Sequence, residues 1–184
     1  MLPSSPGRPR GRLFSPSEVC YECQASVVSG PQPLSDLLAA LASDQISPGS
    51  GTAAASAMGF AAACAAKALA ISRKHRPPDD VSIAAETQLK EIIRRSLQRA
   101  AVDSACFEDF LRRKNQKTAA ALIEADQETQ ALAAELLLLL DRVEPLVHAV
   151  VAGDIFAARA LLDAATRIQA RICEENQRAA ASLL

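Results

Sequence analysis

The feature that most constrains the fold is an alanine-rich segment directly after a Pro-Gly-Ser-Gly-Thr loop. Residues 53–70 include eleven alanines, where an ordinary core helix would carry Leu, Ile or Val. Positions four apart in this region, which lie on one side of a helix, hold only small residues: Gly51, Ala55, Gly59 and Ala63. Because another backbone can approach such a side closely, the segment predicts a central helix enclosed by others.

Apolar residues recur at helical spacing from residue 33 onward, and no segment alternates with the period of two that a strand requires. The spacing predicts helices over 34–41, 51–74, 80–111, 132–150 and 155–172. We expect Pro145 to kink the fourth of these, and Gly153-Asp154 to mark the start of the last. The fold class is therefore all-α, a bundle of about five helices with the alanine-rich helix at its centre.

Domain organisation follows a change in composition near residue 30. Residues 1–30 mix Pro, Ser, Gly and Arg without an apolar period, which is typical of a flexible extension. Residues 31–184 are expected to form one helical domain, which is long enough to bury a core. Since five helices have few faces with which to enclose the alanine-rich helix, we expect a homodimer at least, with a second subunit covering part of that helix.

Composition and charge argue against several classes of function. A formal net charge of −1 and a pI near 6.1 do not suit a nucleic-acid-binding protein. The alanine-rich segment is interrupted by Lys67 and lacks aromatic anchors, so we do not expect it to span a membrane. Five cysteines without regular spacing suit a reducing, cytoplasmic location. Cys20 and Cys23 form a lone Cys-x-x-Cys, and His75 and His148 are isolated in sequence, so no metal site is predicted.

Several short motifs resemble those of the formiminotetrahydrofolate cyclodeaminase and methenyltetrahydrofolate cyclohydrolase family. The family opens with a Leu-rich helix, an Ala-Ser-Asp step and a glycine-rich loop before a long alanine helix. The matching segments here are Ala42-Ser43-Asp44, Pro48-Gly49-Ser50-Gly51-Thr52, Ser72-Arg73-Lys74 and Asp103-Ser104-Ala105-Cys106-Phe107. The resemblance covers about residues 33–176 and is strongest in its first third.

The resemblance implies an all-helical dimer that acts on the one-carbon unit of tetrahydrofolate. One reaction of the family releases ammonia from 5-formiminotetrahydrofolate and closes the 5,10-methenyl ring. The other interconverts the methenyl and 10-formyl forms. The tetrahydrofolate derivative is the substrate, and neither reaction requires a metal, redox cofactor or prosthetic group.

The chain departs from the family pattern at three places. The middle glycine of the loop is Ser50, Arg159-Ala160 stands where a Ser-Asp pair is expected, and the proline usual early in the fourth helix is missing near Thr129 to Leu132. The second departure favours an alternative, in which the chain is a catalytically degenerate member that serves as a dimeric scaffold or regulatory partner. A third possibility is an enzyme of the same fold that acts on a different one-carbon or amidine substrate.

The loop from Pro48 through Gly49, Ser50 and Gly51 to Thr52 is the predicted substrate-binding segment. Its glycines let the backbone approach a flat ligand, and the N–H groups of the following helix favour a carboxylate or an electron-rich oxygen. The alternative is that the loop only caps the helix and permits tight packing.

Asp103 is the candidate general acid or base, because burial would raise the pKa of a carboxyl group toward neutrality. Its alternative is a surface acid that pairs with Arg99. Asp44 is a weaker catalytic candidate, since a loop acid is often a turn residue. Lys67, Arg73 and Lys74 are candidates for binding the carboxylates of folate, although Lys67 could equally extend to the surface.

Overall fold

A computed structural model of the chain describes residues 32–77 and 79–183, so the predicted extension over residues 1–30 lies outside the described residues. Helix α1 (Gln32–Leu41) crosses the boundary between two units of the chain, and the unit that begins at Leu38 contains everything considered below. Every regular element in the described ranges is a helix, and none is a strand. The all-α prediction is therefore confirmed.

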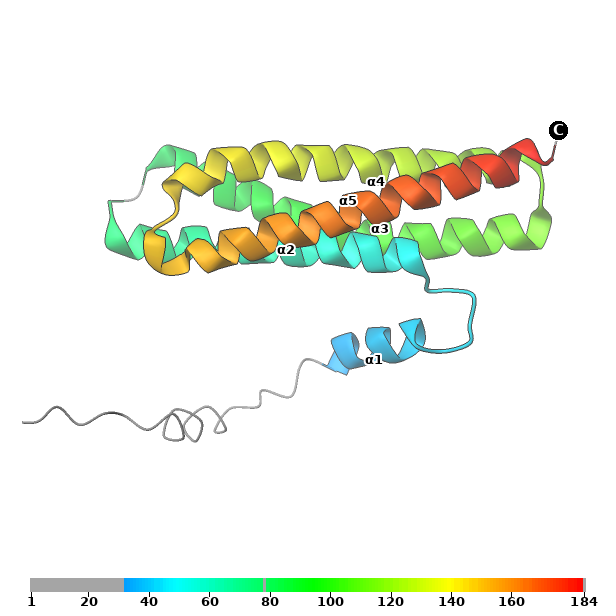
Figure 1. Cartoon of the computed structure of the whole chain (residues 1–184), viewed down its shortest axis with the longest axis horizontal. Coiled ribbons are helices and arrows are strands. Elements are labelled where there is room, and N and C mark those ends of the chain that lie inside the picture. The colour runs from blue at the N-terminus through cyan, green and yellow to red at the C-terminus, as the bar shows by residue number, and fades with distance from the viewer. Residues whose placement is uncertain (1–31, 78, 184) are drawn as a thin grey trace, which may run out of the picture. The chain divides into compact units, whose positions relative to one another are not determined.

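Four long helices form an antiparallel bundle (Figure 1). They are α2 (Ser50–Ser72), α3 (Asp80–Arg113), α4 (Gln116–Val143) and α5 (Ala152–Ala181). Helix α2 packs along both α3 and α5, and α4 packs along the same two helices on the opposite side. Short 3-10 turns lie in the connections, namely η2 (Arg73–His75), η3 (Glu144–Leu146) and η4 (Ala149–Val151).

Helix ends in the bundle follow local capping chemistry. Asp79 precedes α3, and its carboxylate accepts the backbone N–H of Ser82 at 2.8 Å. Asn115 and Thr118 form a reciprocal capping box at the start of α4. Between these two helices, Lys114 adopts a left-handed conformation with φ of 44°, which ends α3 and lets the chain reverse within two residues.

The predicted kink at Pro145 is wrong, because the helix ends there instead. Helix α4 stops at Val143, and two 3-10 turns lead to α5, which begins at Ala152. Proline lacks the N–H that would continue the helical hydrogen bonds, and its ring collides with the carbonyl of the preceding turn. The predicted boundary at Gly153 is correct to within one residue.

Helix α2 is the centre of the bundle. Twelve of its 23 residues are buried within a single chain. The bundle itself therefore covers much of the helix surface that, from the sequence, we expected a second subunit to cover. The stripe of small residues does not run straight, since Gly51, Ala55 and Gly59 are buried and Ala63 is exposed. Positions four apart drift around a helix of 3.6 residues per turn, which accounts for the difference.

The span Ser50–His75 is long and apolar enough to cross a membrane by length and composition, and half of its most apolar window is buried inside the bundle. The core helix of a soluble protein passes the same test, so this feature does not identify a membrane protein. Large aliphatic side chains pack around the alanines of this helix from the other three: Leu89, Ile92, Leu136, Leu140, Ile155 and Leu162.

Candidate functional site

A cavity of about 310 Å³ lies where the start of α2 meets α3 and α5. This volume is at the lower end of the range typical of small-molecule pockets. The lining residues are Ile46, Ser47, Gly49, Ser50, Gly51, Asp103, Ser104, Phe107, Ile172, Glu175 and Asn176. The cavity therefore brings together the glycine-rich loop and the candidate acid, which the sequence analysis selected separately.

Gly51 brings the backbone of α2 against the carboxyl group of Asp103. A β-carbon at position 51 would lie less than 3.0 Å from all three atoms of that carboxyl group, a separation that real β-carbons essentially never show. Gly51 has no left-handed φ that would by itself require glycine. The glycine is therefore required by this close approach.

Thr52 holds α3 against the first turn of α2. Its backbone N–H and its hydroxyl group both lower the pKa of Asp103. Its hydroxyl also lies 2.9 Å from the Ser104 hydroxyl and 3.3 Å from the carbonyl oxygen of Ala100. The first N–H groups of a helix have no partner within the helix, so a carboxylate is well placed to accept from them.

The pKa of Asp103 is raised from 3.8 to about 6. The largest cause is burial, and the negative charge of Asp126 adds to it, whereas the hydrogen bonds from Thr52 act in the opposite direction. A carboxyl group with a pKa near neutrality can both donate and accept a proton at physiological pH. Asp103 is thus suited to acid–base chemistry.

Asp126 lies on α4 behind the cavity and is only 1% exposed. Its Oδ1 accepts the Nε2–H of Gln169 at 2.9 Å, and its Oδ2 accepts the Nδ2–H of Asn176 at 2.8 Å. Burial raises the pKa of Asp126, and the two amide donors partly lower it. Asn176 also lines the cavity, so it connects Asp126 to the site that contains Asp103.

The two remaining loop and turn candidates lie outside the lining. Pro48 follows a cis Ser47–Pro48 peptide bond and is half-buried, but it is absent from the cavity wall. Asp44 is exposed and is also absent from that wall. Thr52 is buried immediately behind the wall and acts through Asp103.

The three candidate cations lie far from the cavity, toward the other end of α2 and in the η2 turn that follows it. Lys67 is sixteen residues beyond Gly51, which is about 24 Å at the helical rise of 1.5 Å per residue. Its ammonium group pairs with Asp154 at 3.0 Å. Arg73 pairs with Glu86, and Lys74 is exposed. None of these three side chains lines the cavity.

Sequence reasoning missed the polar residues that α4 and α5 contribute, chiefly Asp126, Gln169 and Asn176. Asp126 falls in the register of the buried positions Leu122 and Thr129. An acid in the apolar stripe of a helix is the signal that could have identified it, since a buried carboxylate requires hydrogen-bond partners.

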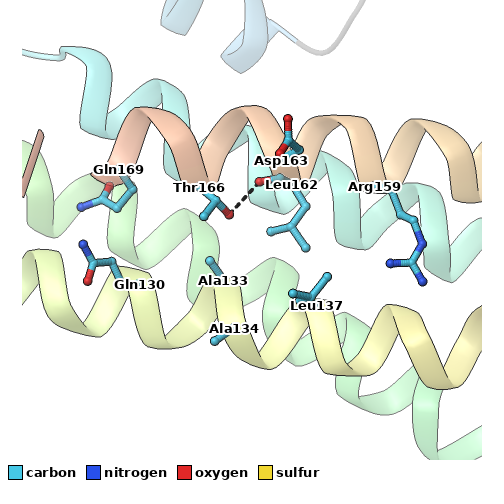
Figure 2. Close-up of a pocket in the computed structure, with 9 residues that line it drawn as sticks. All are labelled: Gln130, Ala133, Ala134, Leu137, Arg159, Leu162, Asp163, Thr166 and Gln169. Carbon is cyan, nitrogen blue, oxygen red and sulfur yellow. Dashed lines mark hydrogen bonds between the residues drawn. The ribbon is translucent and has the colours of Figure 1, made fainter. Parts of the chain in front are cut away.

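A larger cavity of about 450 Å³ lies between α4 and α5 (Figure 2). Its wall is mainly aliphatic, and its cation, Arg159, pairs with Asp141 and Glu144. Gln169 reaches this groove as well, although its amide nitrogen is bonded to Asp126. Because its polar groups do not converge on one point, the groove is a weaker candidate for chemistry than the cavity at Asp103.

The two histidines, isolated in sequence, meet at the other end of the bundle. The rings of His75 and His148 stack with centroids 4.5 Å apart. The backbone N–H of His148 donates to the Ser72 hydroxyl at 2.8 Å, which ties the α4–α5 connection to the end of α2. Within the described ranges, no three His, Cys, Asp or Glu side chains gather as the ligands of one metal ion would.

No protein-family model matches the chain, and no curated protein matches it either.

Proposed function

We propose that the chain is a folate-dependent one-carbon enzyme, a formiminotetrahydrofolate cyclodeaminase or a methenyltetrahydrofolate cyclohydrolase. The observation that carries the proposal is the position of Asp103, which lies in the cavity wall against the first turn of α2. The loop and the acid that resemble those of the family meet in one cavity, although about fifty residues separate them in the sequence.

In the cyclodeaminase reaction, N10 of the folate attacks the formimino carbon, and the bond from that carbon to the terminal nitrogen breaks. Protonated Asp103 donates its proton to the nitrogen that leaves as ammonia. Its carboxylate then accepts the proton released from N10, which restores the starting state. A pKa of about 6 suits both steps, because each protonation state is accessible near pH 7.

In the cyclohydrolase reaction, the carboxylate of Asp103 accepts a proton from a water molecule that attacks the methenyl carbon. The bond from that carbon to N5 then breaks, N5 takes the proton from Asp103, and the hydroxyl proton is released to solvent, which leaves the 10-formyl form. The same residue serves both reactions, and they differ in whether water or an internal nitrogen is the nucleophile. The geometry of the cavity favours neither reaction over the other.

The charge of the cavity supports a substrate with a cationic reacting group. Its two ionisable lining residues, Asp103 and Glu175, are both acids, and Glu175 is paired with Arg171 at 2.7 Å. The formimino group is an amidine that is protonated near neutral pH, and the methenyl bridge carries a positive charge. Both groups are therefore attracted by acidic side chains.

The carboxylates of folate require cations elsewhere, and the adjoining surface of α5 supplies them. A shallower cavity that shares Ser50, Ile172 and Glu175 with the first is also lined by Arg167 and Arg171. We propose these two arginines for the tail of the substrate, in place of Lys67, Arg73 and Lys74. Arg171 would exchange its ion pairs with Glu174 and Glu175, and Arg167 its 3.9 Å contact with Asp163, for the carboxylates of the substrate.

A turnover assay tests the proposal most simply. The purified chain is incubated with 5-formiminotetrahydrofolate or with 5,10-methenyltetrahydrofolate, and the absorbance of the methenyl form is followed. Asp103→Asn is the catalytic variant, and Asp109→Asn is its control, since Asp109 lies on the same helix and pairs with Arg112 and Arg113. The proposal requires turnover by the wild type and by the control, and loss of turnover in Asp103→Asn.

The alternative function is that of a dimeric scaffold or regulatory partner without catalysis. The observation that favours it is Arg159, which replaces a site element of the family and is engaged in ion pairs with Asp141 and Glu144. Large exposed apolar side chains on α4 and α5 offer a surface for the second subunit in either case: Leu137, Leu138 and Phe156.

A further inference from the structure

Asp126 forms the rear of the proposed folate site and has both carboxylate oxygens engaged. Each oxygen accepts one amide N–H, from Gln169 at 2.9 Å and from Asn176 at 2.8 Å. A carboxylate accepts at both oxygens, whereas a protonated carboxyl group must donate from one of them. Among the described residues, no acceptor for such a proton is bonded to Asp126. This arrangement matches the ionised form.

The bond to Asp126 also fixes which end of the Asn176 side chain is available to a ligand. The amide nitrogen of Asn176 is directed to Asp126, and the side chain lines the cavity. Its carbonyl oxygen receives no hydrogen bond from the described part of the chain. The amide therefore presents an acceptor to whatever fills the cavity.

Asp103 faces charged groups from two other helices. Asp126 approaches from α4, and Glu175 of α5 lines the same cavity. Helix α2 contributes only the N–H and hydroxyl group of Thr52. On α3 itself, Arg99 is engaged by Glu128 of α4, and Cys106 carries a thiol whose pKa is raised. Of these charges, that of Asp126 is the one that raises the pKa of Asp103.

We propose that Asp126 is a positioning residue of this site, which holds the amide nitrogen of Asn176 so that its carbonyl is turned toward the cavity, and whose charge opposes the ionisation of Asp103. A nearby negative charge disfavours ionisation of a carboxyl group, and the two amide donors stabilise the charge on Asp126. The inference rests on the proposed function, because the pair prepares a proton donor and an acceptor for the amidine of the substrate.

Carbon-13 NMR of the aspartate carboxyl groups in the wild type, without ligand, tests the assignment of the proton. Asp103 is expected to titrate near pH 6, and Asp126 is expected to remain ionised throughout that titration. A protonated Asp126 beside an ionised Asp103 at pH 6 would overturn the proposal. This measurement requires no variant and no folate, so it remains informative if the proposed function fails.

Asp126→Asn and Glu124→Gln then test the effect of the charge. Both changes remove one negative charge from α4, but Glu124 is exposed and has no ion pair within the described ranges. The titration midpoint of Asp103 is expected to fall by about one unit in Asp126→Asn, and to be unchanged in Glu124→Gln. Equal shifts in the two variants, or none in either, would contradict the proposal. If Asp126→Asn does not fold, the wild-type titration decides.

A binding arm separates this inference from the folate proposal. Affinity for 5-formyltetrahydrofolate is expected to fall about tenfold in Asp126→Asn, which corresponds to the loss of one good hydrogen bond. If the wild type also fails to bind, while both carboxyl groups titrate as expected, the folate proposal is wrong and the positioning role stands. If the wild type and Asp126→Asn bind with the same affinity, the positioning role is contradicted and the folate proposal stands.

Discussion

Gly51 and the carboxyl group of Asp103 are in such close contact that a β-carbon at position 51 would lie less than 3.0 Å from all three carboxyl atoms. The contact joins the first turn of α2 to the middle of α3 and forms one wall of the cavity. It also accounts for the glycine-rich loop that precedes the alanine helix. The loop brings bare backbone to an acid, and the acid is half-buried as a result.

Gly51→Ala is expected to displace Asp103 and to return the pKa of that residue toward its ordinary value. Gly59→Ala is the matched control on the same helix, because its β-carbon would meet the β-carbon of Ser96 at an ordinary 3.5 Å. The control is expected to stabilise the protein by roughly 0.5–1 kcal/mol, since alanine favours a helix over glycine. Urea denaturation and the carboxyl titration measure the two effects. Equal behaviour of the two variants would contradict the contact.

Asp103→Asn is expected to stabilise the protein at pH 7 while removing catalysis. The pKa of Asp103 is raised from 3.8 to about 6 on folding, so the folded state binds this proton more tightly than the unfolded state. The favourable contribution is complete below pH 3.8 and is lost as the pH rises to about 6. Above that pH the ionised carboxylate destabilises the folded state. Asp103→Asn removes this effect and is expected to raise the free energy of unfolding by about 1–2 kcal/mol, after allowance for partial solvent screening.

Denaturation of wild type and Asp103→Asn across pH 3 to 8, roughly the range in which carboxyl groups titrate, checks this expectation. The stability difference should grow from about pH 4 to about pH 6, between the unfolded and folded pKa values of Asp103, and then stay constant. A difference that is independent of pH would show that Asp103 is not buried as described.

Arg159→Ser tests whether the departure from the family pattern affects the site. Arg159 connects the start of α5 to the end of α4 through Asp141 at 2.8 Å and through Glu144. Because these ion pairs are partly exposed, their loss is expected to cost about 0.5–1 kcal/mol. Arg159 does not line the cavity at Asp103, so folate binding is expected to be unchanged. Loss of binding in a folded Arg159→Ser protein would extend the site to this end of the bundle.

Leu137→Glu is expected to convert a dimer into monomers, if the second subunit covers the α4–α5 face. Leu137 is 47% exposed and lies beside the 64% exposed Leu138. Leu97→Glu, at a 62% exposed position of α3, is the control. Sedimentation equilibrium distinguishes the 19.4 kDa chain from its dimer. A wild-type monomer, or a dimer that is insensitive to Leu137→Glu, would contradict this interface.

Much of the fold could be predicted from sequence because helical periodicity is a local signal. The spacing of apolar residues located the long helices and the bounds of α2 and α3 to within two residues. It placed the start of α4 at residue 132, however, whereas that helix begins at Gln116. The end of α4 was missed, since proline can either kink a helix or terminate it, and the choice depends on what the following chain packs against.

The site was only half predictable, since it is built by contacts between distant segments. The loop and Asp103 were found separately from their local chemistry, but their contact depends on the register between α2 and α3. Lys67 was proposed from its place on α2, and the length of that helix carries it away from the cavity. Asp126 and Asn176 become part of the site only through their mutual hydrogen bond, which no local pattern reveals.

Calorimetric titration of the purified chain with 5-formyltetrahydrofolate, a stable analogue, tests the central claim most directly. The measurement is made on the wild type and on Gly51→Val, whose side chain would occupy the position of the Asp103 carboxyl group. The account predicts saturable binding by the wild type and its loss in a folded Gly51→Val protein. Absence of binding by the well-folded wild type would contradict the folate proposal and leave the scaffold as the better account.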